Sequence, residues 1–163
     1  MTETPRVGIG FDVHPWEEGR PLMLGGIRFD GVDGLSGHSD GDAVCHALAD
    51  ALLGAAALGD VGEHFPESDP AFGGIAGLDL LARTLSIVAD AGFAAASCDL
   101  TVIGERPPIA PRRSEMRSAL ARALGLAVGA VSVKATRPEG LGLQGDGVGC
   151  MAVALIEPIA GSR

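Results

Sequence analysis

The chain has 163 residues, 47% of them hydrophobic, which is enough for one domain with a sizeable core. Its formal net charge is −9, from 12 Lys and Arg against 21 Asp and Glu. Because clustered cations bind nucleic acids and anionic membranes, this balance argues against both as partners, and the absence of a signal-peptide pattern or a membrane-length apolar run predicts a cytoplasmic protein.

The chain begins with a predicted β-ribbon. The segments RVGIGFDV (6–13) and PLMLGGIRF (21–29) have strand-like composition, and we expect a loop over HPWEEGRP (14–21) to join them. A glycine-rich connection, DGVDGLSGH (30–38), should follow the second strand.

A strong helix pattern comes next. Ser39 is the expected N-cap, with Asp42 at the third position as in a capping box, and Gly59 should end the helix. The apolar stripe of this helix repeats at three and four residues, at Val44, Ala47, Leu48, Ala51, Leu52 and Ala55. Residues 59–76 then have the composition of a mobile loop.

The second half of the chain adds two helices and three strands. In order, these are a helix over 77–92, a strand over 97–104, a proline-rich turn over 106–111, a helix over 111–125, and strands over 130–136 and 148–157. The order ββααβαββ predicts an α/β (α+β) two-layer sandwich, with helices on one face of a mixed four- to five-stranded sheet, as a single domain spanning 1–163. Since only 4% of residues are aromatic, small aliphatic side chains should pack the helices closely on the sheet.

The uncovered face of the predicted sheet should be apolar, rich in Val, Leu, Ala and Cys. Such a patch is too large to leave exposed, so we expect an oligomer that buries it. The cysteines Cys45, Cys98 and Cys150 are scattered and odd in number, which makes a disulfide framework or a Cys-type zinc site improbable.

Asp12, His14 and His46 form the most informative pattern. Asp12 and His14 are two apart on a predicted strand and therefore leave the same face, while His46 lies on the predicted helix. A carboxylate and two imidazoles are zinc ligands, and three protein ligands leave one tetrahedral position open, as in catalytic sites. Any one of these histidines could instead be a partly buried structural imidazole.

The loops offer further candidates, each with a simpler structural alternative. His38, Ser39 and Asp42 surround a helix N-terminus that could bind an anion, although Ser39 and Asp42 could merely cap the helix. Asp60, followed by Gly62, could hold a substrate hydroxyl or be a turn residue. The remaining loop candidates are carboxylates: Glu67 and Asp69, which could simply be solvated, and Glu139, a possible ligand of a second metal.

Long segments of the chain resemble the 2-C-methyl-D-erythritol 2,4-cyclodiphosphate synthase family. The similar segments are GFDVHP, LGG, GHSDGDAVCHALADALLGAAALGDVGEHFPESDP and KAT, and the resemblance spans nearly the whole chain. It implies a homotrimer with active sites between subunits. It also implies a phosphorus–oxygen lyase of non-mevalonate isoprenoid synthesis, in which the 2-phosphate of 4-diphosphocytidyl-2-C-methyl-D-erythritol 2-phosphate attacks the β-phosphate. The products would be the 2,4-cyclodiphosphate and CMP.

The resemblance also implies roles for particular residues. One Zn²⁺ per chain would be held by Asp12, His14 and His46, and Mg²⁺ or Mn²⁺ would be held with the substrate by Glu139. Catalytic roles fall on His38, Asp60 and Arg137. Substrate contacts fall on Ser39, Asp60, Gly62, Phe65, Pro66, Glu67, Ser68 and Asp69. Nucleotide contacts fall on Gly104, Glu105, Arg106, Pro107, Pro108, Ile109, Ala135, Thr136, Arg137, Glu139 and Leu143.

Three positions depart from the family pattern. Arg137 replaces a threonine that helps bind the diphosphate, and Pro108 replaces a lysine of the cytosine loop. Asp146 replaces an arginine associated with an isoprenoid diphosphate on the threefold axis, and it should repel such a ligand. These departures keep two alternatives open: a non-catalytic trimeric metal- and nucleotide-binding relative, or a zinc-dependent phosphate-ester hydrolase.

Overall fold

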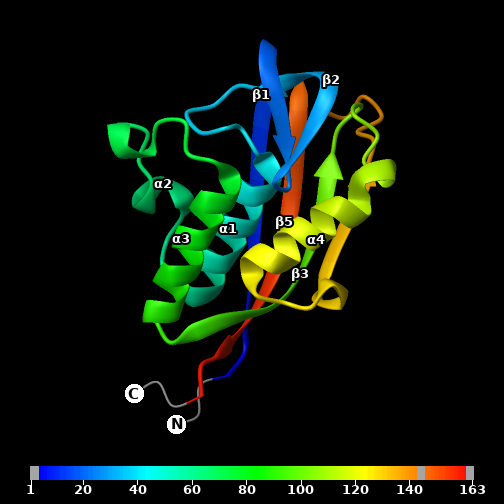
Figure 1. Cartoon of the computed structure of the whole chain (residues 1–163). Helices are drawn as coiled ribbons and strands as arrows, with labels where there is room; N and C mark the ends of the chain where they lie inside the picture. The colour runs from blue at the N-terminus through cyan, green and yellow to red at the C-terminus, as the bar shows by residue number, and fades with distance from the viewer. Residues whose placement is uncertain (1–3, 143–145, 161–163) are drawn as a thin grey trace.

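The computed structural model describes residues 4–142 and 146–160 (Figure 1). Five strands form one mixed sheet in the order β2-β1-β5-β3-β4. The strands are β1 (Arg6–Leu24), β2 (Ile27–Leu35), β3 (Phe93–Ile103), β4 (Val131–Thr136) and β5 (Gly147–Pro158). The helices are α1 (Ala43–Ala56), α2 (Val61–His64), α3 (Gly77–Asp90) and α4 (Arg113–Leu124), with short 3-10 turns η1 (Pro70–Phe72), η2 (Ala110–Arg112) and η3 (Val128–Ala130).

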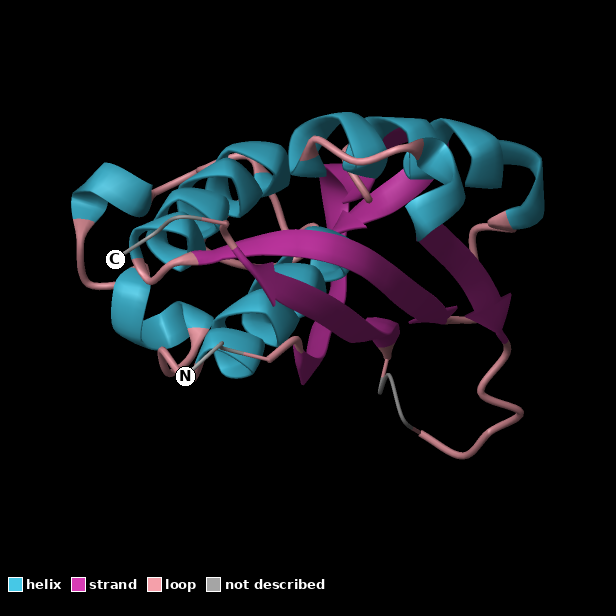
Figure 2. Cartoon of the chain, turned by 90° about the horizontal axis from the view of Figure 1, so that it is seen from below, coloured by secondary structure: helices cyan, strands magenta, loops and turns pink. Residues whose placement is uncertain are grey.

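The longer helices α1, α3 and α4 lie on one side of the sheet (Figures 1 and 2). Strands β3 and β4 are parallel, and the other neighbouring strands are antiparallel. The predicted element order, the mixed sheet and the two-layer arrangement are therefore confirmed. None of the helices in the described part of the chain combines the length and the apolar character that a membrane span needs.

The predicted loop over 14–21 is wrong, because β1 continues through it. β1 pairs with β5 over residues 6–15 and with β2 from Trp16 onward, so the β1–β2 hairpin extends past the end of β5. Its register shifts around Pro21, and such an irregularity accommodates a residue that cannot donate a ladder hydrogen bond. The hairpin turns at Gly25 and Gly26, which both have positive φ.

Helix α1 is capped by Asp42 and not by Ser39 as predicted. The fully buried Asp42 carboxylate accepts hydrogen bonds from the backbone N–H groups of Val44 and Cys45. It also accepts bonds at 2.8 and 2.7 Å from the hairpin turn, from Gly25 N and Gly26 N. One carboxylate therefore joins the start of the helix to the tip of the hairpin.

The end of α1 also differs from the prediction. The helix stops at Ala56, before the predicted Gly59, and Ala57 takes a left-handed conformation at its end. The Leu58 N–H then bonds the Leu53 carbonyl at 3.0 Å, which satisfies a backbone group left free by the helix end.

Helix α1 packs directly on the backbone of β1. An added Cβ at Gly8 would lie 2.0 Å from the Ala51 carbonyl oxygen, and one at Gly10 would lie 2.0 Å from the Ala47 carbonyl oxygen. This confirms the expected close contact between helix and sheet through small residues. The contact also places the first turns of α1, which carry His46, beside the part of β1 that carries Asp12 and His14.

No helix of the described residues covers the opposite face of the sheet (Figure 1). Along β1, Val7 and Ile9 are 66% and 65% exposed, and Met151 and Val153 extend this apolar surface on β5. The prediction that cysteines contribute to this surface is wrong. Cys98 and Cys150 point toward the helices, and all three cysteines are buried and unpaired.

Candidate metal centre and pocket

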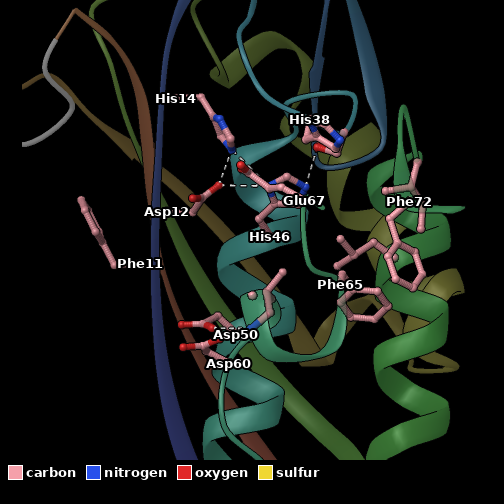
Figure 3. A pocket seen from close by; sticks show the side chains of 15 residues that line it. Phe11, Asp12, His14, His38, His46, Asp50, Asp60, Phe65, Glu67 and Phe72 are labelled. Atoms are coloured by element: carbon pink, nitrogen blue, oxygen red, sulfur yellow. Dashed lines mark hydrogen bonds and ion pairs between the residues drawn. The ribbon is translucent and has the colours of Figure 1, made fainter. Parts of the chain in front are cut away.

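The side chains of Asp12, His14 and His46 point toward one another between β1 and α1 (Figure 3). Asp12 Oδ2 lies 2.8 Å from His14 Nε2 and 3.1 Å from His46 Nδ1. The two imidazole nitrogens are 3.1 Å apart. Within the described residues, this is the one group of three or more His, Cys, Asp or Glu whose donor atoms come close enough to share a metal ion.

Both imidazoles are oriented by a second hydrogen bond. His46 Nε2 lies 2.9 Å from Ser39 Oγ, and that oxygen already accepts from the Gly41 N–H. The imidazole of His14 also has a hydrogen bond with the Ser36 backbone. These bonds hold the two rings in place beside Asp12, as outer hydrogen-bond partners do for metal-ligating histidines.

The electrostatics of the three groups are coupled. Burial alone would raise the pKa of Asp12, but hydrogen bonds from His14 and His46 outweigh it and hold this pKa well below its usual range. Burial lowers the pKa of His14, whereas the hydrogen bond to Asp12 raises it, and the net shift is upward. Asp12 is therefore ionised at neutral pH, as a candidate metal ligand should be.

The donor set fits a divalent zinc ion. Ligands in tetrahedral zinc sites lie about 3.3 Å apart, given Zn–N and Zn–O bonds of about 2.0–2.1 Å. The three donor atoms here are separated by 2.8 to 3.1 Å and need only a small expansion. Three protein ligands leave one position for a substrate oxygen.

The triad opens onto a pocket of about 410 Å³, a size typical of small-molecule sites. Among the predicted catalytic and substrate residues, it brings together His38, Ser39, Asp60, Gly62, Phe65 and Glu67. The predicted contacts Pro66, Ser68 and Asp69 do not line it. None of the described residues that line this pocket is Lys or Arg.

The 59–76 segment is folded in the structure and carries α2 and η1. Asp60 caps α2 by accepting from Glu63 N at 3.0 Å, and Asp69 caps η1 by accepting from Ala71 N at 2.9 Å. Phe65 is buried and packs edge-on against Phe72, with ring centroids 5.3 Å apart. Asp60 therefore caps a helix and also lines the pocket, whereas Asp69 caps η1 outside the pocket lining.

Asp50 lines the pocket, although sequence reasoning gave it no role. Asp50 lies one helical turn after His46 on α1. Because residues four apart lie on the same side of a helix, this spacing could have predicted that both side chains face the pocket. Burial raises the pKa of Asp50, and the nearby Asp60 and Asp12 carboxylates raise it further, while a bond from Val61 N opposes the shift. Asp50 and Asp60 lie next to each other below the triad in Figure 3.

A separate hollow of about 340 Å³ gathers most of the predicted nucleotide residues. Its predicted members are Gly104, Glu105, Arg106, Pro107, Pro108, Ile109, Ala135, Thr136 and Arg137. Val102, Ala110 and Arg113 also line it and were not predicted. The hollow shares no lining residue with the metal pocket.

Glu139 lines neither the metal pocket nor this hollow, and no described group places it with other metal ligands. It has a positive φ of 51°, an uncommon conformation for a non-glycine residue. The predicted nucleotide contact Leu143 lies outside the described residues.

These features define a class: an α/β protein with a candidate three-ligand metal centre at the mouth of an open pocket. Within that class, the chain belongs to the YgbB family, whose model matches residues 5–157.

Relatives of known name agree with this assignment. The chain is 49% identical to the 2-C-methyl-D-erythritol 2,4-cyclodiphosphate synthase of Symbiobacterium thermophilum, covering 92% of this chain and 97% of the relative. It is 51% identical to a bifunctional enzyme IspD/IspF of Anaeromyxobacter, of which it spans only 39%. A solved 2C-methyl-D-erythritol-2,4-cyclodiphosphate synthase with bound CDP superposes with a TM-score of 0.86 at 36% identity, over 93% of this chain and all of that one.

Proposed function

We propose that the protein is a cytoplasmic cyclodiphosphate synthase of isoprenoid biosynthesis. It converts 4-diphosphocytidyl-2-C-methyl-D-erythritol 2-phosphate to 2-C-methyl-D-erythritol 2,4-cyclodiphosphate and CMP. The observation that carries the proposal is the convergence of Asp12, His14 and His46 on one point beside His38 and Ser39. Full-length relatives that carry the synthase name support the choice of substrate.

The residues of the pocket act by binding and orientation. The reaction is intramolecular, so bringing the 2-phosphate to the β-phosphate supplies much of the rate enhancement. His38 is exposed at the pocket rim and donates to the attacking phosphate, and Asp60 accepts from a substrate hydroxyl. The aromatic pair Phe65 and Phe72 forms the apolar wall that keeps water from this end of the pocket.

Bound metal ions would allow this acidic pocket to bind a polyphosphate. Asp12, Asp50, Asp60 and Glu67 line it without a compensating Lys or Arg in the described chain. Zn²⁺ on the triad and Mg²⁺ or Mn²⁺ on Glu139 would neutralise and polarise the phosphates when bound. Asp12, His14 and His46 are fixed by their own hydrogen bonds before any ion arrives.

The nucleotide would occupy the hollow formed by residues 104–109 and 135–137. Arg137, where relatives have a threonine, contributes charge toward the diphosphate there. Because this hollow and the metal pocket share no lining residue within one chain, each active site would form between two subunits of a homotrimer. The apolar sheet face that includes Val7, Ile9, Met151 and Val153 would be buried in that trimer.

Replacing Ile9 with aspartate should prevent trimer formation. The side chain is 65% exposed on the helix-free face of β1, so an isolated subunit tolerates the charge. In a trimer, three carboxylates would be desolvated at a cost of several kcal/mol each. Light scattering coupled to size exclusion should give the monomer mass. Val128→Asp, which changes a 43% exposed residue of η3, is the control and should remain trimeric.

The product distribution tests the proposed reaction. Incubating the metal-loaded protein with the cytidine diphosphate substrate should release CMP and the cyclic diphosphate in equal amounts by phosphorus NMR. A linear diphosphate product would instead indicate a zinc-dependent hydrolase. Binding of CDP without CMP release from the substrate would indicate a non-catalytic relative.

A further inference from the structure

Arg20, near the end of β1, holds the segment that contacts both imidazoles of the triad. Its Nη1 donates to the Gly37 carbonyl at 2.9 Å, and its Nη2 donates to the Ser39 carbonyl. These two carbonyls lie on either side of His38. Glu17 Oε2, 3.1 Å from Nη1, fixes the guanidinium from the hairpin side. The planar guanidinium of Arg20 therefore bonds the backbone on both sides of His38.

The segment Ser36–Ser39 orients the candidate metal ligands. The Ser36 backbone bonds one ring nitrogen of His14, and Ser39 Oγ lies 2.9 Å from His46 Nε2. Gly37 packs against the His14 ring so closely that an added Cβ would be 3.0 Å from Cε1. A displacement of this segment would therefore move both imidazoles as well as His38.

Other backbone groups of the Ser36–Ser39 segment form hydrogen bonds with parts of the chain other than Arg20. The His38 carbonyl accepts from Gly74 N at 2.7 Å, and Ser36 N donates to the Pro15 carbonyl at 2.8 Å. Arg20 thus supplies the bonds at the two carbonyls flanking His38. Gly37 is half-buried and Ser39 is buried, so losing the bonds from Arg20 would leave their carbonyls partly shielded from water and without this donor.

We propose that Arg20 is a positioning residue that sets the Ser36–Ser39 segment, so that His38 faces the pocket and Ser39 and Ser36 orient the two imidazoles. The part of this inference that concerns His38 rests on the proposed function. The part that concerns the imidazoles does not, because metal binding alone reports on it. Arg20 touches no reacting atom and acts through the segment it holds.

Metal affinity and turnover of Arg20→Met, measured on the full chain, test this role. Zn²⁺ affinity, from competition with a chromophoric chelator, should fall about 10–100-fold, the usual effect of losing a group that orients metal ligands. The visible absorption of the Co²⁺ form should change in position or intensity because the imidazoles shift. In the synthase assay, kcat should fall by a similar factor while KM changes less.

Arg28→Met is the matched control. Arg28 lies on β2 of the same hairpin, is more exposed and pairs through its side chain with Asp30 at 2.9 Å. Its loss should leave Zn²⁺ affinity, the Co²⁺ spectrum and kcat at the parent values. Parent-like values in Arg20→Met as well would overturn the proposal, as would equal losses in both variants.

If Arg20→Met does not fold, the same measurements are made on Arg20→Lys. Lysine keeps the charge and the aliphatic stem, but its ammonium cannot bond both carbonyls as a planar fork does. An intermediate loss of Zn²⁺ affinity is expected, and parent-like affinity with an unchanged Co²⁺ spectrum would overturn the proposal. If the parent protein binds Zn²⁺ but forms no cyclic product, the proposed function fails while the metal measurements still decide the role of Arg20.

Discussion

His46→Ala should abolish stoichiometric zinc binding and synthase activity while leaving the subunit folded and the oligomer intact. The substitution removes one of three donor atoms that lie within 3.1 Å of one another. Zn²⁺ affinity should fall by more than the roughly 10–100-fold loss that follows when only a hydrogen-bond partner of a metal ligand is removed. Elemental analysis of the purified variant, together with CMP release, measures both effects.

The structure also predicts what His46→Ala should spare. His46 lies on the pocket side of α1, whereas the apolar surface expected to join subunits is on the opposite face of the sheet. Light scattering should therefore give the parent mass. His64→Ala is the control, since His64 bonds the Leu58 carbonyl on the neighbouring loop and should keep one zinc per chain. A His46→Ala variant that still holds one zinc per chain would show that the ligand set is wrong.

The convergence of the triad was predictable because it depends on two local periodicities. Alternation along β1 puts Asp12 and His14 on one face, and the stripe of α1 fixes which way His46 points. Sequence alone could not show that α1 crosses β1 at this level. The glycines and alanines that allow the close crossing are visible in the sequence, but their partners are not.

The errors have a common physical origin in contacts between distant segments. Residues 14–21 have loop-like composition, yet β1 continues through all of them because it pairs with β5 and then with β2. Asp42 is the cap because it also accepts bonds from Gly25 and Gly26 in the hairpin turn. Ser39 is thereby left to bond His46, a role that a capping-box pattern does not predict.

The same reasoning explains why Arg20 carries no signal in the sequence. Its two carbonyl partners lie 17 and 19 residues further along the chain and are main-chain atoms, so no side-chain motif records the contact. The nucleotide hollow was easier to predict, since residues 104–109 follow β3 and residues 135–137 lie at the end of β4, its parallel, hydrogen-bonded neighbour. Neighbouring parallel strands end at the same edge of a sheet.

Gly10→Ala should destabilise the protein by about 3 kcal/mol or more, at the upper end of the usual cost of overpacking. The new Cβ would lie 2.0 Å from the Ala47 carbonyl oxygen and 2.7 Å from Ala51 N, both of them backbone atoms of α1. A helix backbone cannot yield as a flexible side chain does, so α1 must move away from β1. Urea unfolding at a fixed protein concentration measures the loss.

The Gly10→Ala variant should also weaken the metal centre without touching a ligand. His46 adjoins Ala47 on α1, and Asp12 is two residues beyond Gly10 on β1, so separating the two elements draws the donor atoms apart. Gly54→Ala is the control within the same helix. Its Cβ would meet only the Ile9 carbonyl oxygen at 3.8 Å, so it should stabilise the protein by about 0.5–1 kcal/mol and leave Zn²⁺ affinity unchanged. Equal stability of the two variants would contradict the close contact between α1 and β1 on which the candidate site depends.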